Sequence, residues 1–271
     1  MCTRNACCFK QMALRMKTTP ILHLLIGVAV MISLATNWLL LRRCVDAYRE
    51  NAEMRLNPGN VLQFEAANLS LAKSNGDEVR IVFLGDSRIA QWTGLPVVPG
   101  SLSINRGVSV ETTAQVLQRL QRDVFDIGAD VVVVQVGIND LKLLGLFPSM
   151  ASDIVRRCRE NIEQIVRAIS DRGISVIVMT ILPAGKIEYS RRLIWSETTR
   201  ASIARINRWL LEDTREGFTV VNCDLGIGDG DRVKAEYARD SLHLNASGYA
   251  VLESLLLPIL TDCVARHRTR D

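Results

Sequence analysis

The sequence has few of the residues that hold metal ions or build disulfide frameworks. Its 271 residues include three histidines and seven cysteines, and no two cysteines form a Cys-x-x-Cys pair. The cysteines are Cys2, Cys7, Cys8, Cys44, Cys158, Cys223 and Cys263. This spacing is typical of neither a zinc site nor a disulfide-stabilised fold, so we expect no metal and no cofactor.

Acidic side chains are missing from the first 43 residues, which carry six lysines and arginines. The rest of the chain carries 27 basic and 29 acidic residues, so the net charge of +4 originates near the N-terminus. A nucleic-acid-binding domain usually has a basic stripe or patch, and the body of this chain has none. The composition therefore predicts no nucleic-acid partner.

Residues 21–41 lack charge altogether. In a helix this run spans about 31 Å at about 1.5 Å per residue, which matches the hydrocarbon core of a bilayer. A cleaved signal peptide usually has a shorter apolar core that ends at small residues, whereas this run ends in Trp-Leu-Leu-Leu-Arg-Arg. We predict an uncleaved, single-pass membrane anchor, with a cleaved signal peptide and a buried helix as alternatives. The slight excess of basic residues before the run predicts a cytoplasmic N-terminus and a body outside the cytoplasm.

Two turn signals, Asn57-Pro58-Gly59-Asn60 and Ser74-Asn75-Gly76-Asp77, interrupt the stretch that follows the anchor. We therefore expect four segments: a basic flank (1–20), the anchor (21–41), a stalk or linker (42–78) and a folded domain (79–271). The last segment is long enough to enclose one sizeable hydrophobic core.

Apolar runs and amphipathic stretches alternate from residue 79 onward. Residues 130–136 are a Val-rich run typical of a strand buried on both faces, and residues 152–170 repeat apolar side chains at helical spacing. The strands that we expect cover 79–84, 102–105, 130–136, 174–181 and 218–222, and the helices cover 111–122, 152–170, 196–212 and 246–265. This order predicts an α/β fold of three layers, in which helices cover both faces of a parallel sheet and functional residues follow the carboxyl ends of its strands.

One histidine lies within the predicted folded domain at a place suited to catalysis. His23 falls in the anchor and His267 in an Arg-rich tail, which leaves His243. A serine hydroxyl needs such a base to become a useful nucleophile, and Ser87 follows the first predicted strand. Asp240 precedes the histidine by three residues and can orient its ring. Taken singly, these side chains are more often helix caps or polar turn residues; together they predict a catalytic triad.

Ester hydrolysis also requires hydrogen-bond donors for the oxyanion of the tetrahedral intermediate. Gly107 follows the second predicted strand and presents a backbone N–H without a side chain in the way. Asn139 follows the third and presents a side-chain amide. With the N–H of Ser87, these groups form the expected oxyanion hole.

The polar clusters, in this order, resemble the conserved blocks of the SGNH hydrolase (GDSL-like lipase/esterase) family. They are Gly85-Asp86-Ser87, Asn105-Arg106-Gly107, Gly137-Ile138-Asn139-Asp140 and Asp240-Ser241-Leu242-His243, and the run from His243 to Tyr249 is close to the family form. The resemblance covers about residues 79–265. It implies a flavodoxin-like sheet of about five parallel strands, Ser87 as nucleophile, Gly107 and Asn139 as oxyanion donors, and metal-free hydrolysis through an acyl-enzyme.

Two positions depart from the family pattern. Arg88 stands where the GDSL name has leucine, and Val110 occupies a place where many relatives have a second glycine, which leaves the size of the substrate open. Arg88 and Arg106 flank the predicted site. They are expected either to contact an anionic or sugar substrate or to form surface salt bridges.

We therefore expect a membrane-anchored serine esterase. Its location suggests small acyl esters as substrates, with O-acetyl groups on envelope or exported polysaccharide as the first choice. An acyltransferase or a lipid or thioester acyl hydrolase on the same site, and a non-catalytic, membrane-tethered binding module, are the alternatives.

Overall fold

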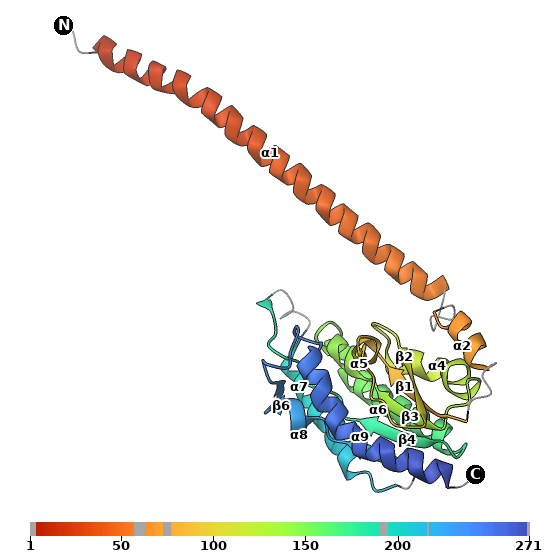
Figure 1. The fold of residues 1–271 in the computed structure, drawn as a ribbon. Coiled ribbons are helices and arrows are strands. Elements are labelled where there is room, and N and C mark those ends of the chain that lie inside the picture. Colours follow the sequence, from red (N-terminus) through yellow and green to blue (C-terminus); the bar gives the residue numbers. More distant parts are fainter. Residues whose placement is uncertain (1–3, 57–62, 73–76, 190–194, 216, 270–271) are drawn as a thin grey trace. The chain divides into compact units, whose positions relative to one another are not determined.

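The computed structural model describes residues 4–56, 63–72, 77–189, 195–215 and 217–269 (Figure 1). The chain forms two compact units, Met1–Pro58 and Gly59–Asp271. The turn signal at residues 57–60, and the one at 74–77 except for Asp77, lie outside the described residues.

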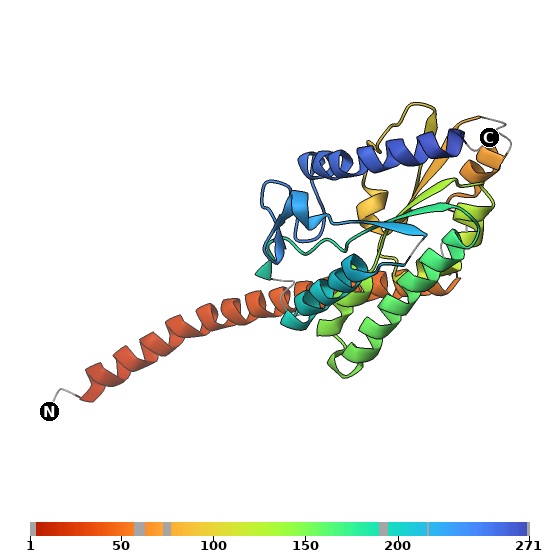
Figure 2. The ribbon, with the colours of Figure 1, turned by 90° about the horizontal axis from the view of Figure 1, so that it is seen from below.

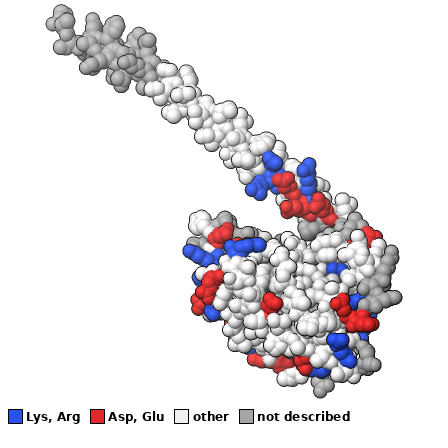
Figure 3. Space-filling model, in the orientation of Figure 1, with Lys and Arg blue, Asp and Glu red and all other residues white. Residues whose placement is uncertain are grey.

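The first unit is a long helix, α1 (Arg4–Leu56). Its stretch Pro20–Glu53 is long and apolar enough to cross a membrane, and its most apolar part is not buried against the protein. Figure 3 shows an uncharged section of this helix, followed by basic and acidic side chains towards its C-terminal end. The apolar helix predicted at residues 21–41 is confirmed. An exposed apolar helix near the N-terminus is consistent with a membrane anchor and with a signal sequence alike.

The second unit contains a five-stranded parallel sheet, as predicted. Its order is β2-β1-β3-β4-β5. The strands are β1 (Val79–Gly85), β2 (Ser101–Gly107), β3 (Val131–Gln135), β4 (Ser175–Met179) and β5 (Phe218–Val221). A short antiparallel pair, β6 (Gly228–Asp229) and β7 (Arg232–Val233), lies outside this sheet.

Helices cover both faces of the sheet. The larger helices are α6 (Ala151–Ser170), α7 (Glu197–Glu212) and α9 (Ala246–Arg268). Figure 2 shows α9 on one face and α6 with α7 on the other, so the unit has three layers. Shorter helical segments are α2 (Glu65–Ala72), α3 (Ser87–Ala90), α4 (Thr113–Gln118), α5 (Ile138–Leu141), α8 (Asp224–Ile227), a π-helix η1 (Gln121–Phe125), and the 3-10 turns η2 (Lys142–Gly145) and η3 (Pro148–Met150).

Alternation along each strand produces two separate cores. In β3, Val132 and Val134 face the core shared with α4, α6 and α7, whereas Val131 and Val133 face the core shared with α9. Successive side chains of a strand point to opposite faces of the sheet, so a strand covered on both faces must be apolar throughout. For this reason the Val-rich run at residues 130–136 correctly predicts a strand that is buried on both faces.

The structure differs from the predicted boundary at residue 79. The second unit begins at Gly59, so α2 belongs to the compact unit and not to a free stalk. Leu71 packs against the core on the α6 side, and its carbonyl oxygen accepts a hydrogen bond of 3.1 Å from Arg80.

Candidate active site

Ser87 begins the short helix α3 directly after β1. The strand ends at Gly85, where a Cβ atom would collide with the carbonyl oxygen of Gln135 on β3. Asp86 caps the helix, because its Oδ1 accepts a 2.9 Å hydrogen bond from the N–H of Arg88. The turn therefore fixes Ser87 at the carboxyl end of the central strands, where it is 5% exposed.

The structure brings Ser87, His243 and Asp240 together. Ser87 Oγ lies 3.0 Å from His243 Nε2. On the other side of the ring, His243 Nδ1 lies 2.9 Å from Asp240 Oδ2. With the proton on Nδ1 the ring donates to Asp240, so Nε2 is free to accept the serine proton. This is the arrangement of a serine–histidine–aspartate triad.

Asp240 is held in its charged form by its surroundings. Burial favours the neutral acid, but hydrogen bonds from the His243 ring and from the backbone N–H groups of Leu242 and His243 outweigh it and hold the pKa of Asp240 below its ordinary value. The backbone bonds measure 2.7 and 2.9 Å, both to Oδ1. An ionised Asp240 stabilises the imidazolium that forms when His243 accepts a proton.

Arg88 connects the nucleophile helix to the histidine loop. Its guanidinium donates to three carbonyl oxygens, at 2.9 Å to Leu242, 2.7 Å to Leu182 and 3.1 Å to Pro183. The side chain is 1% exposed, and burial lowers its pKa. The expectation that Arg88 contacts substrate is corrected by this geometry, because its donors already have partners within the protein.

Arg106 is likewise buried, with 4% of its surface exposed. It donates to the carbonyl oxygen of Asn105 at 2.7 Å and to the side-chain oxygen of Asn68 in α2. Its guanidinium also lies 4.6 Å from the centre of the Phe64 ring. Burial lowers the pKa of Arg106 to about 10. The structure thus gives Arg106 intramolecular partners and corrects both expectations for it, a substrate contact and a surface salt bridge.

The two expected oxyanion donors occupy the ends of neighbouring segments. A Cβ atom at Gly107 would collide with the backbone of Ala90, so β2 packs closely against α3 at this point. The Gly107 N–H donates to the side chain of Asn105 at 2.8 Å. Asn139 Nδ2 donates to the carbonyl oxygen of Glu111 at 2.9 Å. One N–H of the Asn139 amide is used in this way, whereas an oxyanion reaches the Gly107 N–H only by displacing Asn105.

A buried ionic cluster beneath these residues was missed by the sequence analysis. Arg119 Nε lies 2.6 Å from Glu111 Oε2, and Arg119 Nη1 lies 3.0 Å from Asp123 Oδ2. All three side chains are almost fully buried. The four-residue spacing of Arg119 and Asp123 is the one available signal, and it is typical of exposed pairs on helices.

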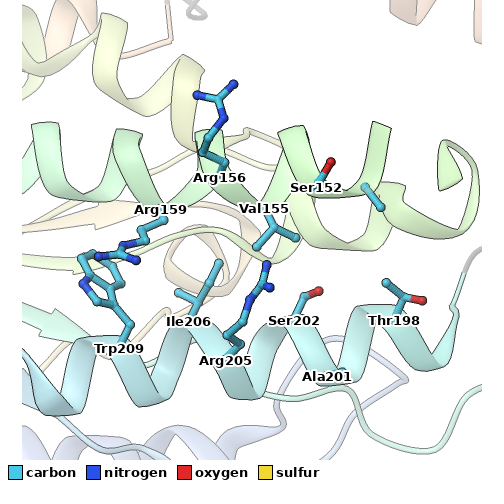
Figure 4. A pocket seen from close by; sticks show the side chains of 11 residues that line it. Ser152, Val155, Arg156, Arg159, Thr198, Ala201, Ser202, Arg205, Ile206 and Trp209 are labelled. Carbon is cyan, nitrogen blue, oxygen red and sulfur yellow. The ribbon is translucent and has the colours of Figure 1, made fainter. Parts of the chain in front are cut away.

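A surface groove of about 670 Å³ lies between α6 and α7 (Figure 4). Its walls include Val155 and Ile206, with Arg159 stacked on Trp209 at one end. None of its lining residues belongs to the triad. Among the residues that the structure describes, no group of histidine, cysteine, aspartate and glutamate side chains is arranged to hold a metal ion.

The fold and the site define a three-layer α/β protein in which Ser87, His243 and Asp240 meet at the carboxyl ends of the parallel strands. The sequence profile of the GDSL-like Lipase/Acylhydrolase family matches residues 83–251. The chain belongs to this family and is an ester-hydrolysing enzyme. No curated protein matches the chain.

Solved structures share the fold at low sequence identity. A protein from Bacteroides fragilis is 22% identical with a TM-score of 0.62, covering 77% of this chain and 99% of that one. A GDSL-like lipase from Bacteroides thetaiotaomicron is 21% identical with a TM-score of 0.59, covering 75% and 98%. The acetyl xylan esterase AlAXEase is 18% identical with a TM-score of 0.51, covering 67% and 99%.

Proposed function

We propose that this protein is a membrane-tethered serine esterase that removes small acyl groups, with Ser87 as its nucleophile. The observation that carries the proposal is the hydrogen-bonded row from Ser87 Oγ through the His243 ring to Asp240. The identity of the family supplies the reaction class, ester hydrolysis.

The reaction begins when His243 Nε2 takes the proton of Ser87 Oγ and the oxygen attacks the ester carbonyl carbon. The carbonyl π electrons move to the oxygen, which the N–H groups of Ser87 and Asn139 stabilise, together with the Gly107 N–H once the side chain of Asn105 is displaced. The imidazolium then donates its proton to the leaving alkoxide, and the ester C–O bond breaks to leave an acyl-enzyme. Water, deprotonated by His243, attacks the acyl carbon and releases the acid with Ser87 restored.

O-acetyl esters of carbohydrate are our first choice of substrate. Ser87 and Asn139 are 5% and 2% exposed, so the reacting groups are buried at the edge of the sheet. The fold is shared with an acetyl xylan esterase. A membrane tether outside the cytoplasm gives access to envelope or exported polysaccharide, and the apolar stretch of α1 supports such a tether.

The first test is the hydrolysis of p-nitrophenyl acetate by the full-length protein in detergent. Ser87→Ala is expected to lower kcat by about 10⁴-fold or more, because the nucleophile is lost. Ser101→Ala is the matched control and should keep wild-type activity, since the Ser101 hydroxyl only donates to the carbonyl oxygen of Val98. Equal rates for Ser87→Ala and the wild type would rule out the assignment.

The same assay across chain lengths tests the acyl group. We expect kcat/KM for p-nitrophenyl acetate to exceed that for p-nitrophenyl octanoate. The reverse order would contradict a small-acyl substrate and redirect the assignment to lipid esters.

A further inference from the structure

Four charged side chains form one ionic cluster beneath the catalytic edge. They are Glu111, Arg119, Arg122 and Asp123, and all except Arg122 are almost fully buried. Removing charges from water is costly, and buried ion pairs often contribute little to net stability. We therefore ask which parts of the catalytic site this cluster holds in position.

Arg119 attaches two parts of the catalytic site to the cluster. Its Nη2 donates to the carbonyl oxygen of Gly85 at 3.0 Å, two residues before Ser87. Its Nε donates to the Glu111 carboxylate, and the Glu111 carbonyl oxygen accepts from the Asn139 amide. The nucleophile turn and the Asn139 side chain are thus linked through one guanidinium.

The outer partner of the cluster is Asn68, which lies in α2 and outside the region that the family profile matches. Asn68 Nδ2 lies 3.2 Å from Asp123 Oδ1, and its Oδ1 accepts from Arg106. Arg106 directly precedes Gly107 and also donates to the carbonyl oxygen of Asn105. The side chain of Asn68 therefore connects the cluster with the end of β2.

Docking of α2 does not depend on this amide alone. Leu71 packs against the hydrophobic core from the same helix, and the Phe64 ring stacks on Arg106. The Asn68 side chain bridges two buried charged groups. Because hydrogen bonds require a narrow range of distances and angles, this bridge fixes the position of both groups relative to α2.

We propose that Asn68, a side chain of α2, is a positioning residue for the oxyanion hole. Through Arg106 it holds the strand end that carries Gly107, and through Asp123 and Arg119 it holds the nucleophile turn. The inference rests on the proposed role of Ser87. It assigns to one side chain that precedes the region matched by the family profile a function in transition-state stabilisation.

The test compares Asn68→Ala with Leu71→Ala in the full-length protein. Both changes weaken the docking of α2, but only the first removes the polar link to the site. Because small misplacement of catalytic groups costs up to about 100-fold in rate, we expect Asn68→Ala to lower kcat for p-nitrophenyl acetate by about 10-fold or more. KM should stay within about twofold of the wild-type value. Leu71→Ala should lower the melting temperature at least as much and keep its kcat.

Asn68→Gln provides a milder version of the same test. It keeps a neutral amide but displaces it by one methylene group, so it should fold and still lower kcat by about threefold or more. Wild-type kcat in a folded Asn68 variant, or an equal fall in Leu71→Ala, would overturn the proposal. Activity in Ser87→Ala overturns the proposed function itself, which separates the two failures.

Discussion

Val110 has an unusual backbone conformation for a β-branched residue. Its φ is 69°, the one positive value at a non-glycine residue in the described chain. It lies in the loop between Gly107 and Glu111, and its side chain is 61% exposed. The family resemblance places a glycine here in many relatives, and the structure shows that the backbone still has the conformation that glycine prefers.

Val110→Gly is expected to stabilise the protein. The left-handed conformation costs an L-residue about 1–2 kcal/mol, and the flexibility of glycine in the unfolded chain offsets about 0.5–1 kcal/mol of that. The free energy of unfolding should rise by up to about 1.5 kcal/mol, measured by urea denaturation. Val110→Ala, which keeps the strain, is the control. A glycine variant less stable than the alanine variant would contradict this account.

Between elements, Asp140 joins α5 to the start of α4. Its Oδ2 accepts from the Thr113 N–H at 2.9 Å, and its Oδ1 accepts from the Thr113 hydroxyl at 2.7 Å. Burial raises the pKa of Asp140 to about 6 and outweighs these hydrogen bonds, which lower it. Asp140 adjoins Asn139, so these two hydrogen bonds also fix the position of Asn139 relative to α4.

Asp140 should make stability depend on pH. Because its folded pKa is raised from 3.8 to about 6, the folded state binds a proton more tightly than the unfolded state. The wild type should therefore lose stability from this group as pH rises from about 4 to about 6. Asp140→Asn cannot titrate, so its stability relative to the wild type should be greater at pH 7.5 than at pH 4.5 in urea denaturation.

The control for this experiment is Asp153→Asn on the exposed side of α6, where Asp153 pairs with Arg156. This substitution removes a carboxylate but leaves the hydrogen bonds between Asp140 and Thr113 unchanged. A difference between Asp140→Asn and the wild type that stays constant over this pH range, or matches that of Asp153→Asn, would exclude Asp140 as the source.

Periodicity predicted the long elements well. The strand at Val131–Gln135 and the helix Ala151–Ser170 have patterns that a local reading recognises, because both bury apolar side chains at regular spacing. The expected helix over 111–122 was wrong in its extent. It divides into α4 and the π-helix η1, and η1 carries Asp123 into the buried cluster. The residues around Asp123 in the sequence do not distinguish this buried, ion-paired carboxylate from an exposed one.

The helix α2 shows a related limit. An eight-residue helix is not stable by itself in water, so its formation depends on tertiary contacts such as that of Leu71. Sequence reasoning had no access to those contacts and assigned the segment to a stalk. By contrast, the grouping of Ser87 with His243 was accessible, because few histidines were available and the cluster that contains Ser87 directly followed a predicted strand.

For the whole molecule, the central proposal is that α1 stays in the membrane with the catalytic domain outside the cytoplasm. A reporter enzyme that is active only in the cytoplasm, fused after Asp271, is expected to give no signal. A second reporter that requires an oxidising compartment should be active at the same position. The opposite pair of signals would show that the catalytic domain lies in the cytoplasm. Release of the domain from membranes at a reduced mass would show that the N-terminal segment is cleaved.

The docking of α2 onto the folded domain also shortens the segment that joins this domain to α1. Beyond residue 41, α1 continues to Leu56, which adds about 22 Å of helix at about 1.5 Å per residue. With α1 in a bilayer, the enzyme is confined to a layer beside the membrane, because the folded domain is covalently joined to the end of α1. Its capacity then scales with membrane area and not with the volume of the compartment, and only esters that enter this layer are within reach.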